Sequence, residues 1–180
     1  MNIRLIKQRG VMPLKFRTRL LRVLKLAQKL AGLGEETGTL NLILTPSDVM
    51  ATMNEAYLGH EGRTDVLTFD LRDTEVAHLH ADDTEVAHLH ADDTEVAHLQ
   101  ADEAEECVAE VYVCPDVAVE YSAKFGTTPS RELVLYMVHG MLHLAGEDDL
   151  EEEARLSMRK AENRVMTALV ERFSLEGFIA

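Results

Sequence analysis

Two histidines four residues apart carry the strongest chemical signal in this chain. His139 and His143 stand in the segment H-G-M-L-H-L-A-G. On an α-helix this spacing puts both imidazoles on one side, one turn apart, so that one divalent ion can bind both. Gly146 allows the helix to end, and Asp148 or Asp149 just beyond it can bring a carboxylate oxygen to the same ion. Two nitrogens and one carboxylate leave a position open for water, which is typical of catalytic zinc sites.

The alternative interpretation is a solvated or packed pair, because the pattern H-x-x-x-H also arises by chance. The residues around the histidines are apolar on nearly every side, which predicts a buried helix. Buried imidazoles need polar partners, and a metal is one of them. The apolar residues of this segment are Leu135, Met137, Val138, Met141, Leu142 and Leu144.

Zinc at this place would lower the pKa of a bound water towards about 7 and could polarise a phosphoryl or carbonyl oxygen. Zinc peptidases of the H-E-x-x-H type carry a glutamate directly after the first histidine as general base. This chain has Gly140 there. Peptidase chemistry is therefore disfavoured, although Glu147 could substitute, and the glycine is expected to leave room beside the metal for a bulky substrate.

A second set of candidate groups precedes the apolar segment 66–69. His60 and Arg63 lie in a stretch bounded by Gly59 and Gly62, and Asp65 follows. The guanidinium of Arg63 can clamp a phosphate through two hydrogen bonds. The alternatives are that Arg63 is a surface loop residue and that Asp65 only orders the turn.

The net charge of −14 argues against a nucleic-acid partner, but the charge is unevenly distributed. Residues 1–30 hold nine of the 18 Lys and Arg residues and no acid, whereas residues 73–102 hold nine acids and no Lys or Arg. The basic N-terminal part can meet a phosphate backbone, or it can be a solvated helix face.

A ten-residue repeat accounts for the acidic stretch. Segments 73–82 and 83–92 both read D-T-E-V-A-H-L-H-A-D, and segment 93–102 differs only at Gln100. A period of ten gives no continuous apolar stripe on a helix or a strand. We therefore predict a surface insertion between two core strands, disordered or weakly structured. Its five histidines, with the nearby acids, could bind metal loosely or sense pH, or the loop has no specific role.

Cysteine content and hydropathy bound the compartment. Cys107 and Cys114 are the only cysteines, as expected in a reducing cytoplasm. No apolar run approaches the roughly 20 residues that span a bilayer, and no secretory signal is recognisable.

Apolar periodicity and turn residues predict an α+β fold: a single domain with a mixed four-stranded sheet, about five helices and the metal site on a helix. Pro13 is expected to open the first helix, and Ser47 and Ser130 are expected to cap two others. The predicted strands are 2–6, 39–44, 65–71 and 108–114, and the predicted helices are 13–31, 47–57, 115–125, 130–144 and 150–172.

Five motifs in order resemble the YbeY endoribonuclease family over nearly the whole chain except the repeat. H-G-x-L-H-L-x-G is highly specific, and T-D-V-L-T-F supports it independently. The matching segments are Asn54-x-x-Tyr57, Thr64-Asp-Val-Leu-Thr-Phe69, Glu110-Val-Tyr-Val-Cys-Pro115, His139-Gly-Met-Leu-His-Leu-Ala-Gly146 and Met158-x-x-x-Glu162.

The chain departs from the family pattern in three places. The family's third metal histidine falls on Asp149, which keeps an ordinary zinc ligand. The family's arginine after the tyrosine falls on Leu58, and Arg63 is the candidate replacement. The family's G-D-I reads Ala109-Glu110-Val111.

The resemblance implies a single-strand-specific, metal-dependent endoribonuclease that matures the 3′ end of small-subunit rRNA and acts in ribosome quality control. It implies one Zn²⁺ per chain on His139, His143 and Asp149, with His139 and His143 as catalytic residues. Arg63 is the candidate third catalytic residue, as the possible replacement for the family's arginine. Expected partners are rRNA precursors and the small ribosomal subunit in the cytoplasm, with no membrane and no DNA. A non-catalytic, zinc-stabilised ribosome-assembly factor is the alternative, and a metallopeptidase is less favoured.

Overall fold

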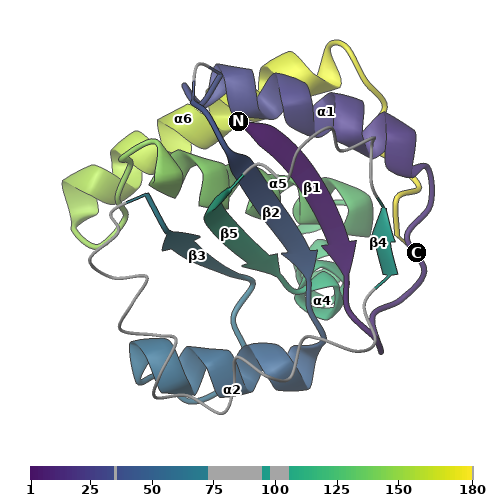
Figure 1. Cartoon of the computed structure of the whole chain (residues 1–180), viewed down its shortest axis with the longest axis vertical. Helices are drawn as coiled ribbons and strands as arrows, with labels where there is room; N and C mark the ends of the chain where they lie inside the picture. Colours follow the sequence, from purple (N-terminus) through teal and green to yellow (C-terminus); the bar gives the residue numbers. More distant parts are fainter. Residues whose placement is uncertain (35, 73–94, 98–105, 180) are drawn as a thin grey trace.

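One mixed sheet runs through the centre of the molecule, in the strand order β3-β5-β2-β1-β4 (Figure 1). The computed structural model describes residues 1–34, 36–72, 95–97 and 106–179. β1, β2 and β5 are parallel, and the edge strands β3 and β4 pair antiparallel to β5 and β1. The strands are β1 (Asn2–Lys7), β2 (Thr39–Leu44), β3 (Val66–Asp70), β4 (Glu95–Ala97) and β5 (Cys107–Val113).

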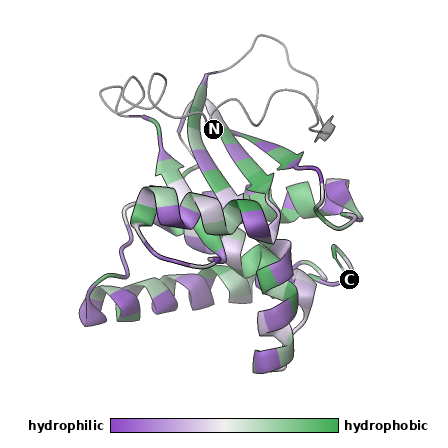
Figure 2. Cartoon of the chain, turned by 90° about the horizontal axis from the view of Figure 1, so that it is seen from below, coloured by the Kyte–Doolittle hydropathy of each residue, from purple (hydrophilic) through white to green (hydrophobic). Residues whose placement is uncertain are grey.

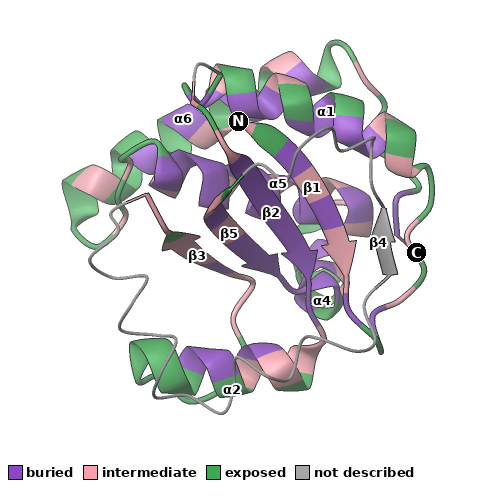
Figure 3. Cartoon of the chain, viewed as in Figure 1, coloured by how far each residue is buried: buried purple, intermediate pink, exposed green. Residues whose placement is uncertain are grey.

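The middle strand β2 is buried along its whole length (Figure 3). Its sequence T-L-N-L-I-L is apolar at four of six positions, as expected for a parallel strand that is covered on both sides. The only polar side chain in its interior, that of Asn41, donates to Glu110 Oε1 at 3.1 Å. β2 therefore forms a covered centre of the sheet, and it pairs with β5, on which the helix that carries His139 and His143 packs.

The described part of the chain forms five helices. α5 contacts β3 and β5, α6 and α4 contact α5, and α1 contacts β1. In Figure 2, the outer sides of the helices are mostly hydrophilic and the strands mostly hydrophobic. The helices are α1 (Arg17–Leu30), α2 (Ser47–Leu58), α4 (Pro115–Phe125), α5 (Pro129–Leu144) and α6 (Glu152–Val170).

The predicted α+β class and the four predicted strands are confirmed. The structure adds a fifth strand, because Glu95–Ala97 of the repeat pairs with Leu5–Lys7 of β1. The rest of the repeat, and with it the prediction of a disordered or weakly structured insertion, lies outside the described residues.

Three predicted helix starts need correction. α1 begins at Arg17 and not at Pro13, because Phe16 has a left-handed backbone with φ of 53°. Ser47 is the first residue of α2 and not its cap; its N–H donates to Asp116 Oδ2 at 3.3 Å.

α5 is capped by Thr128 and not by Ser130. The hydroxyl oxygen of Thr128 accepts from Arg131 N at 3.3 Å. The buried hydroxyl of Ser130 instead accepts from the N–H groups of Phe178 and Ile179. Ser130 therefore ties the C-terminal segment to the start of α5.

In the part of the chain that the structure describes, every helix is too short or too polar to cross a membrane.

Candidate metal centre

Helix α5 carries both histidines and is the most deeply buried of the helices that the structure describes. Its core face packs on β3 and β5 at Gly140, where a Cβ would lie 2.5 Å from Val111 Cγ1 and 3.0 Å from Thr68 Oγ1. No side chain fits in that space without displacing Val111 or Thr68 of the sheet. The expectation that Gly140 leaves room for substrate is therefore wrong: the glycine lets the helix approach the strands.

Gly146 ends α5 as predicted. Its φ of +94° is accessible to glycine at little cost, and its N–H donates to His143 O at 2.9 Å. The N–H of Glu147 reaches back to Leu142 O at 3.0 Å, which completes a Schellman-type turn. The turn folds residues 147–149 back beside the last turn of the helix.

His139 is oriented by a carboxylate on the neighbouring helix α6. Its Nδ1 lies 2.6 Å from Glu162 Oε1, and both side chains are about one-fifth exposed. An ionised carboxylate only accepts hydrogen bonds, so the proton of the neutral imidazole sits on Nδ1. Nε2 of His139 is then a free acceptor. Carboxylate–histidine pairs of this kind support metal ligands in many proteins.

His143 is oriented in the same way by the turn. Its Nδ1 lies 3.0 Å from the carbonyl oxygen of Glu147, which can only accept. Nε2 of His143 therefore also presents a lone pair, and it faces Nε2 of His139 at 2.9 Å. Two acceptors at this distance repel each other unless a cation lies beside both or one of the two rings carries a proton on Nε2 and donates it to the other. This arrangement fits a bound metal ion.

Asp149 completes the group. Its carboxylate oxygens lie 3.7 Å from His139 Nε2 and 3.8 Å from His143 Nε2. The three side chains can each offer one ligand atom within 4.8 Å of the others. Ligand atoms around a tetrahedral zinc are about 3.3 Å apart, given bonds of about 2.0 Å. Asp148 is not part of this group. Its Oδ1 accepts from the N–H groups of Asp149 and Leu150.

The electrostatics favour positive charge at this group. Burial disfavours the charged form of His139, but the hydrogen bond and charge of Glu162 outweigh it, and Asp149 and Asp65 add to the effect. The pKa of His139 is therefore raised above its ordinary value. The same carboxylates would attract a divalent cation.

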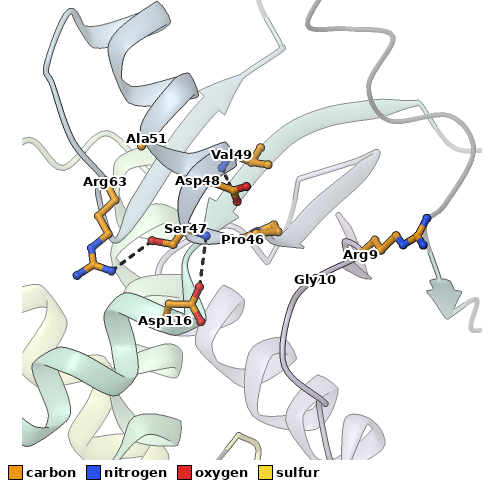
Figure 4. Close-up of a pocket in the computed structure, with 9 residues that line it drawn as sticks. All are labelled: Arg9, Gly10, Pro46, Ser47, Asp48, Val49, Ala51, Arg63 and Asp116. Carbon is orange, nitrogen blue, oxygen red and sulfur yellow. Dashed lines mark hydrogen bonds between the residues drawn. The ribbon is translucent and has the colours of Figure 1, made fainter.

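Arg63 lies away from this group. Its guanidinium forms an ion pair with Glu120 of α4 and donates to Ser47 Oγ at 3.3 Å. Arg63 and Arg9 line a hollow of about 710 Å³ at the start of α2, together with Asp48 and Asp116. Figure 4 shows these side chains. The catalytic role of Arg63 stays a prediction.

The loop that carries His60 is ordered by Asn54. The buried Asn54 amide donates to the carbonyls of His60 and Gly62 at 3.0 and 2.8 Å. Leu58, which stands where the family has arginine, is 55% exposed. At that position the chain therefore presents an apolar side chain to solvent.

Two supporting residues were not assigned a role from the sequence. The supporting role of Glu162 was predictable from the sequence. It is the one acid of α6 after Glu153, and it lies one turn after the buried Met158. Nothing in the sequence around Arg72 indicates that it contacts the end of α5. Its guanidinium donates to Leu144 O at 2.6 Å at the end of α5, and it also pairs with Asp70 and Glu36.

The fold and this group define an α+β protein with a two-histidine, one-carboxylate candidate metal centre on a buried helix. The family model described as Endoribonuclease YbeY matches residues 4–170. The chain belongs to this family.

Individual proteins of the same family are also similar to this chain. Endoribonuclease YbeY of Salinibacter ruber is 33% identical over 131 residues, which cover 73% of this chain and 70% of that protein. Endoribonuclease YbeY of Protochlamydia amoebophila is 50% identical over 62 residues, 34% of this chain and 41% of that protein. The solution structure of TM1509 from Thermotoga maritima shares the fold, with a TM-score of 0.51 and 23% identity over 97% of this chain and 96% of that one.

Proposed function

We propose that this protein is a metal-dependent endoribonuclease that cleaves single-stranded segments of rRNA precursors in the cytoplasm. The observation that carries the proposal is the pair of Nε2 atoms of His139 and His143, 2.9 Å apart, with both Nδ1 atoms engaged elsewhere. Membership in a family named for endoribonuclease activity supports RNA as the substrate.

His139, His143 and Asp149 would hold the ion, and zinc suits a set of two nitrogens and one oxygen. Bound there, the ion supplies a Lewis acid for a phosphoryl oxygen and makes a coordinated water more acidic. Glu162 and the carbonyl of Glu147 keep both imidazoles in the tautomer that leaves Nε2 free. Glu147's carboxylate accepts from Ser157 Oγ at 3.0 Å and is therefore a poor candidate for the base that a peptidase would need.

The proposed partners are rRNA precursors and the small ribosomal subunit. The first 30 residues hold nine basic side chains and no acid. Of these, Arg22, Lys25 and Lys29 are exposed on α1. Exposed cations of this kind can hold a phosphate backbone.

The test is metal content and RNA cleavage measured on the same preparations. Wild type should carry about one zinc per chain and cleave a single-stranded rRNA fragment. His143→Ala should lose both properties while it keeps its circular dichroism spectrum, and Asp149→Ala should lose most of the bound zinc. The matched control Asp148→Ala should keep both, and Asp149→His should retain metal. Cleavage that survives chelation and His143→Ala would refute the proposal.

Leu58 supports a second candidate, a ribosome-assembly factor in which metal only stabilises the fold. This side chain stands exposed where the family has an arginine. Metal-loaded protein would then bind ribosomal particles without cutting RNA. Cleavage by wild type, lost in a site variant that stays folded, excludes this candidate.

A further inference from the structure

The outer surface of α6 is basic next to the candidate metal centre. The first turn of this helix contains Glu152 and Glu153, where acids stabilise the helix N-terminus. From Ala154 to Val170 the single acid is Glu162, which is turned towards His139. The exposed cations on this stretch are Arg155, Arg159, Lys160 and Arg164.

Helical spacing divides these four cations into two pairs. Arg155 and Arg159 precede Glu162 by seven and three residues, so they lie on the same stripe of the helix as Glu162. Lys160 and Arg164 lie two residues to either side of Glu162, which places them on another face. We name Arg155 and Arg159 the arginine stripe. Glu162 contacts His139 at 2.6 Å, so the stripe leads towards the metal centre.

The stripe is available for a ligand. Both side chains are exposed. Among the residues that the structure describes, no carboxylate forms an ion pair with either guanidinium. The two residues are one helical turn apart, about 6 Å along the helix axis. They can therefore contact neighbouring phosphates of one strand.

The net charge of the candidate metal centre explains why cations beside it would help to bind RNA. The charges of Glu162, Asp149 and Asp65 all act on His139. A divalent ion neutralises two of these three negative charges, so the loaded centre would still repel a phosphate. Two arginines beside the centre offset part of this negative charge, and guanidinium groups bind phosphates in a bidentate geometry.

We infer that Arg155 and Arg159 hold the phosphate backbone of a single RNA strand on α6 and lead it to the metal centre. This inference rests on the proposed function for the cleavage reaction, but the binding surface can be tested separately. It names a different part of the surface from the basic N-terminal region.

The test compares two double variants that remove the same charge. One is Arg155→Gln with Arg159→Gln, and its matched control is Lys160→Gln with Arg164→Gln. Binding of zinc-loaded, full-length protein to a fluorescent, single-stranded 2′-O-methyl RNA is measured by anisotropy over a series of salt concentrations. Zinc content and circular dichroism are measured on each preparation.

The arginine double variant should bind about tenfold more weakly, and its plot of log affinity against log salt should flatten by about 1.4, since each phosphate contact on a single strand contributes about 0.7. The control should stay within about twofold of wild type, and Arg155→Lys with Arg159→Lys should keep most of the affinity. Equal effects of both double variants, no effect of the arginine pair, or no binding of RNA by wild type would overturn the inference.

Cleavage of an unmodified strand by the same preparations separates this inference from the proposed function. If wild type binds RNA through the arginine stripe but does not cleave it, the proposed function is refuted and the inference about RNA binding is supported. If wild type cleaves RNA and the arginine double variant binds and cleaves as well as wild type, the stripe fails and the proposed function stands.

Discussion

The carboxylate of Glu162 fixes the orientation and the tautomer of the His139 imidazole. It accepts a hydrogen bond from His139 Nδ1 at 2.6 Å and lies four-fifths buried between α5 and α6. A ligand histidine without such a partner can rotate or change tautomer. Glu162 therefore belongs to the candidate metal centre as the partner that orients one of its histidines.

Replacing Glu162 by glutamine should weaken zinc binding about 10–100-fold. The amide has nearly the same size but carries no charge, so the imidazole loses basicity while the packing is kept. Competition with a chromophoric chelator measures the affinity. Glu153→Gln, an exposed change in the first turn of the same helix, serves as the control and should bind zinc like wild type. Equal affinities for Glu162→Gln and wild type would contradict this role.

The roles of single residues were predictable where the spacing along the sequence determines which side chains lie together. The pairing of His139 with His143 follows from four residues on a helix, and Gly146 was identified as the turn. The choice between Asp148 and Asp149 was not predictable. It depends on which carboxylate accepts the N–H groups of the turn, and in the structure Asp148 does so.

Among the structural elements, the contact of α5 with β3 and β5 does most to position the centre. Its closest point is Gly140 against Val111, with Thr68 beside them. Because this contact lies one residue from His139, a shift of the helix on the sheet moves the imidazole as well.

Gly140→Ala should lower the free energy of unfolding by about 1–3 kcal/mol, since the added methyl group overpacks the contact and outweighs the better helix propensity of alanine. Urea denaturation measures the change. The control is Gly34→Ala, where a Cβ meets nothing closer than 3.5 Å and φ is not positive. A Gly140→Ala protein as stable as the control variant would show that the sheet yields at this point.

Element boundaries were predictable where the signal is local. The predicted ends of the four strands agree with the structure within one residue, because apolar runs bounded by turn residues mark buried strands. The start of α1 was not predictable. Phe16 adopts its left-handed backbone beside Gly177 and Arg19, and the first of these contacts joins segments more than 150 residues apart.

On the scale of the whole molecule, residues from distant parts of the chain support the metal centre. Arg72, just after β3, holds the carbonyl of Leu144 at the end of α5 and pairs with Glu36 near the start of β2. Burial of α5 between the sheet and α6 joins these supports to the core. Binding of a cation should therefore stabilise the entire fold.

Zinc at about 100 times its dissociation constant should add about 2.7 kcal/mol to the stability. For a chain of this size the midpoint of thermal unfolding should rise by about 5–10 °C. Differential scanning calorimetry with zinc and with a chelator measures the shift. His143→Ala should show no shift under the same conditions, and a shift of equal size in that variant would place the ion elsewhere.

The contact at Gly140 also bears on how this type of helix can change its chemistry. Conversion into a zinc peptidase would call for a glutamate directly after His139. Any side chain there would collide with Val111 before it could reach a substrate. The architecture thus separates two kinds of hydrolase through the spacing between a helix and a strand: the close approach of α5 to β5 at Gly140 leaves no space for the base that peptide cleavage would require.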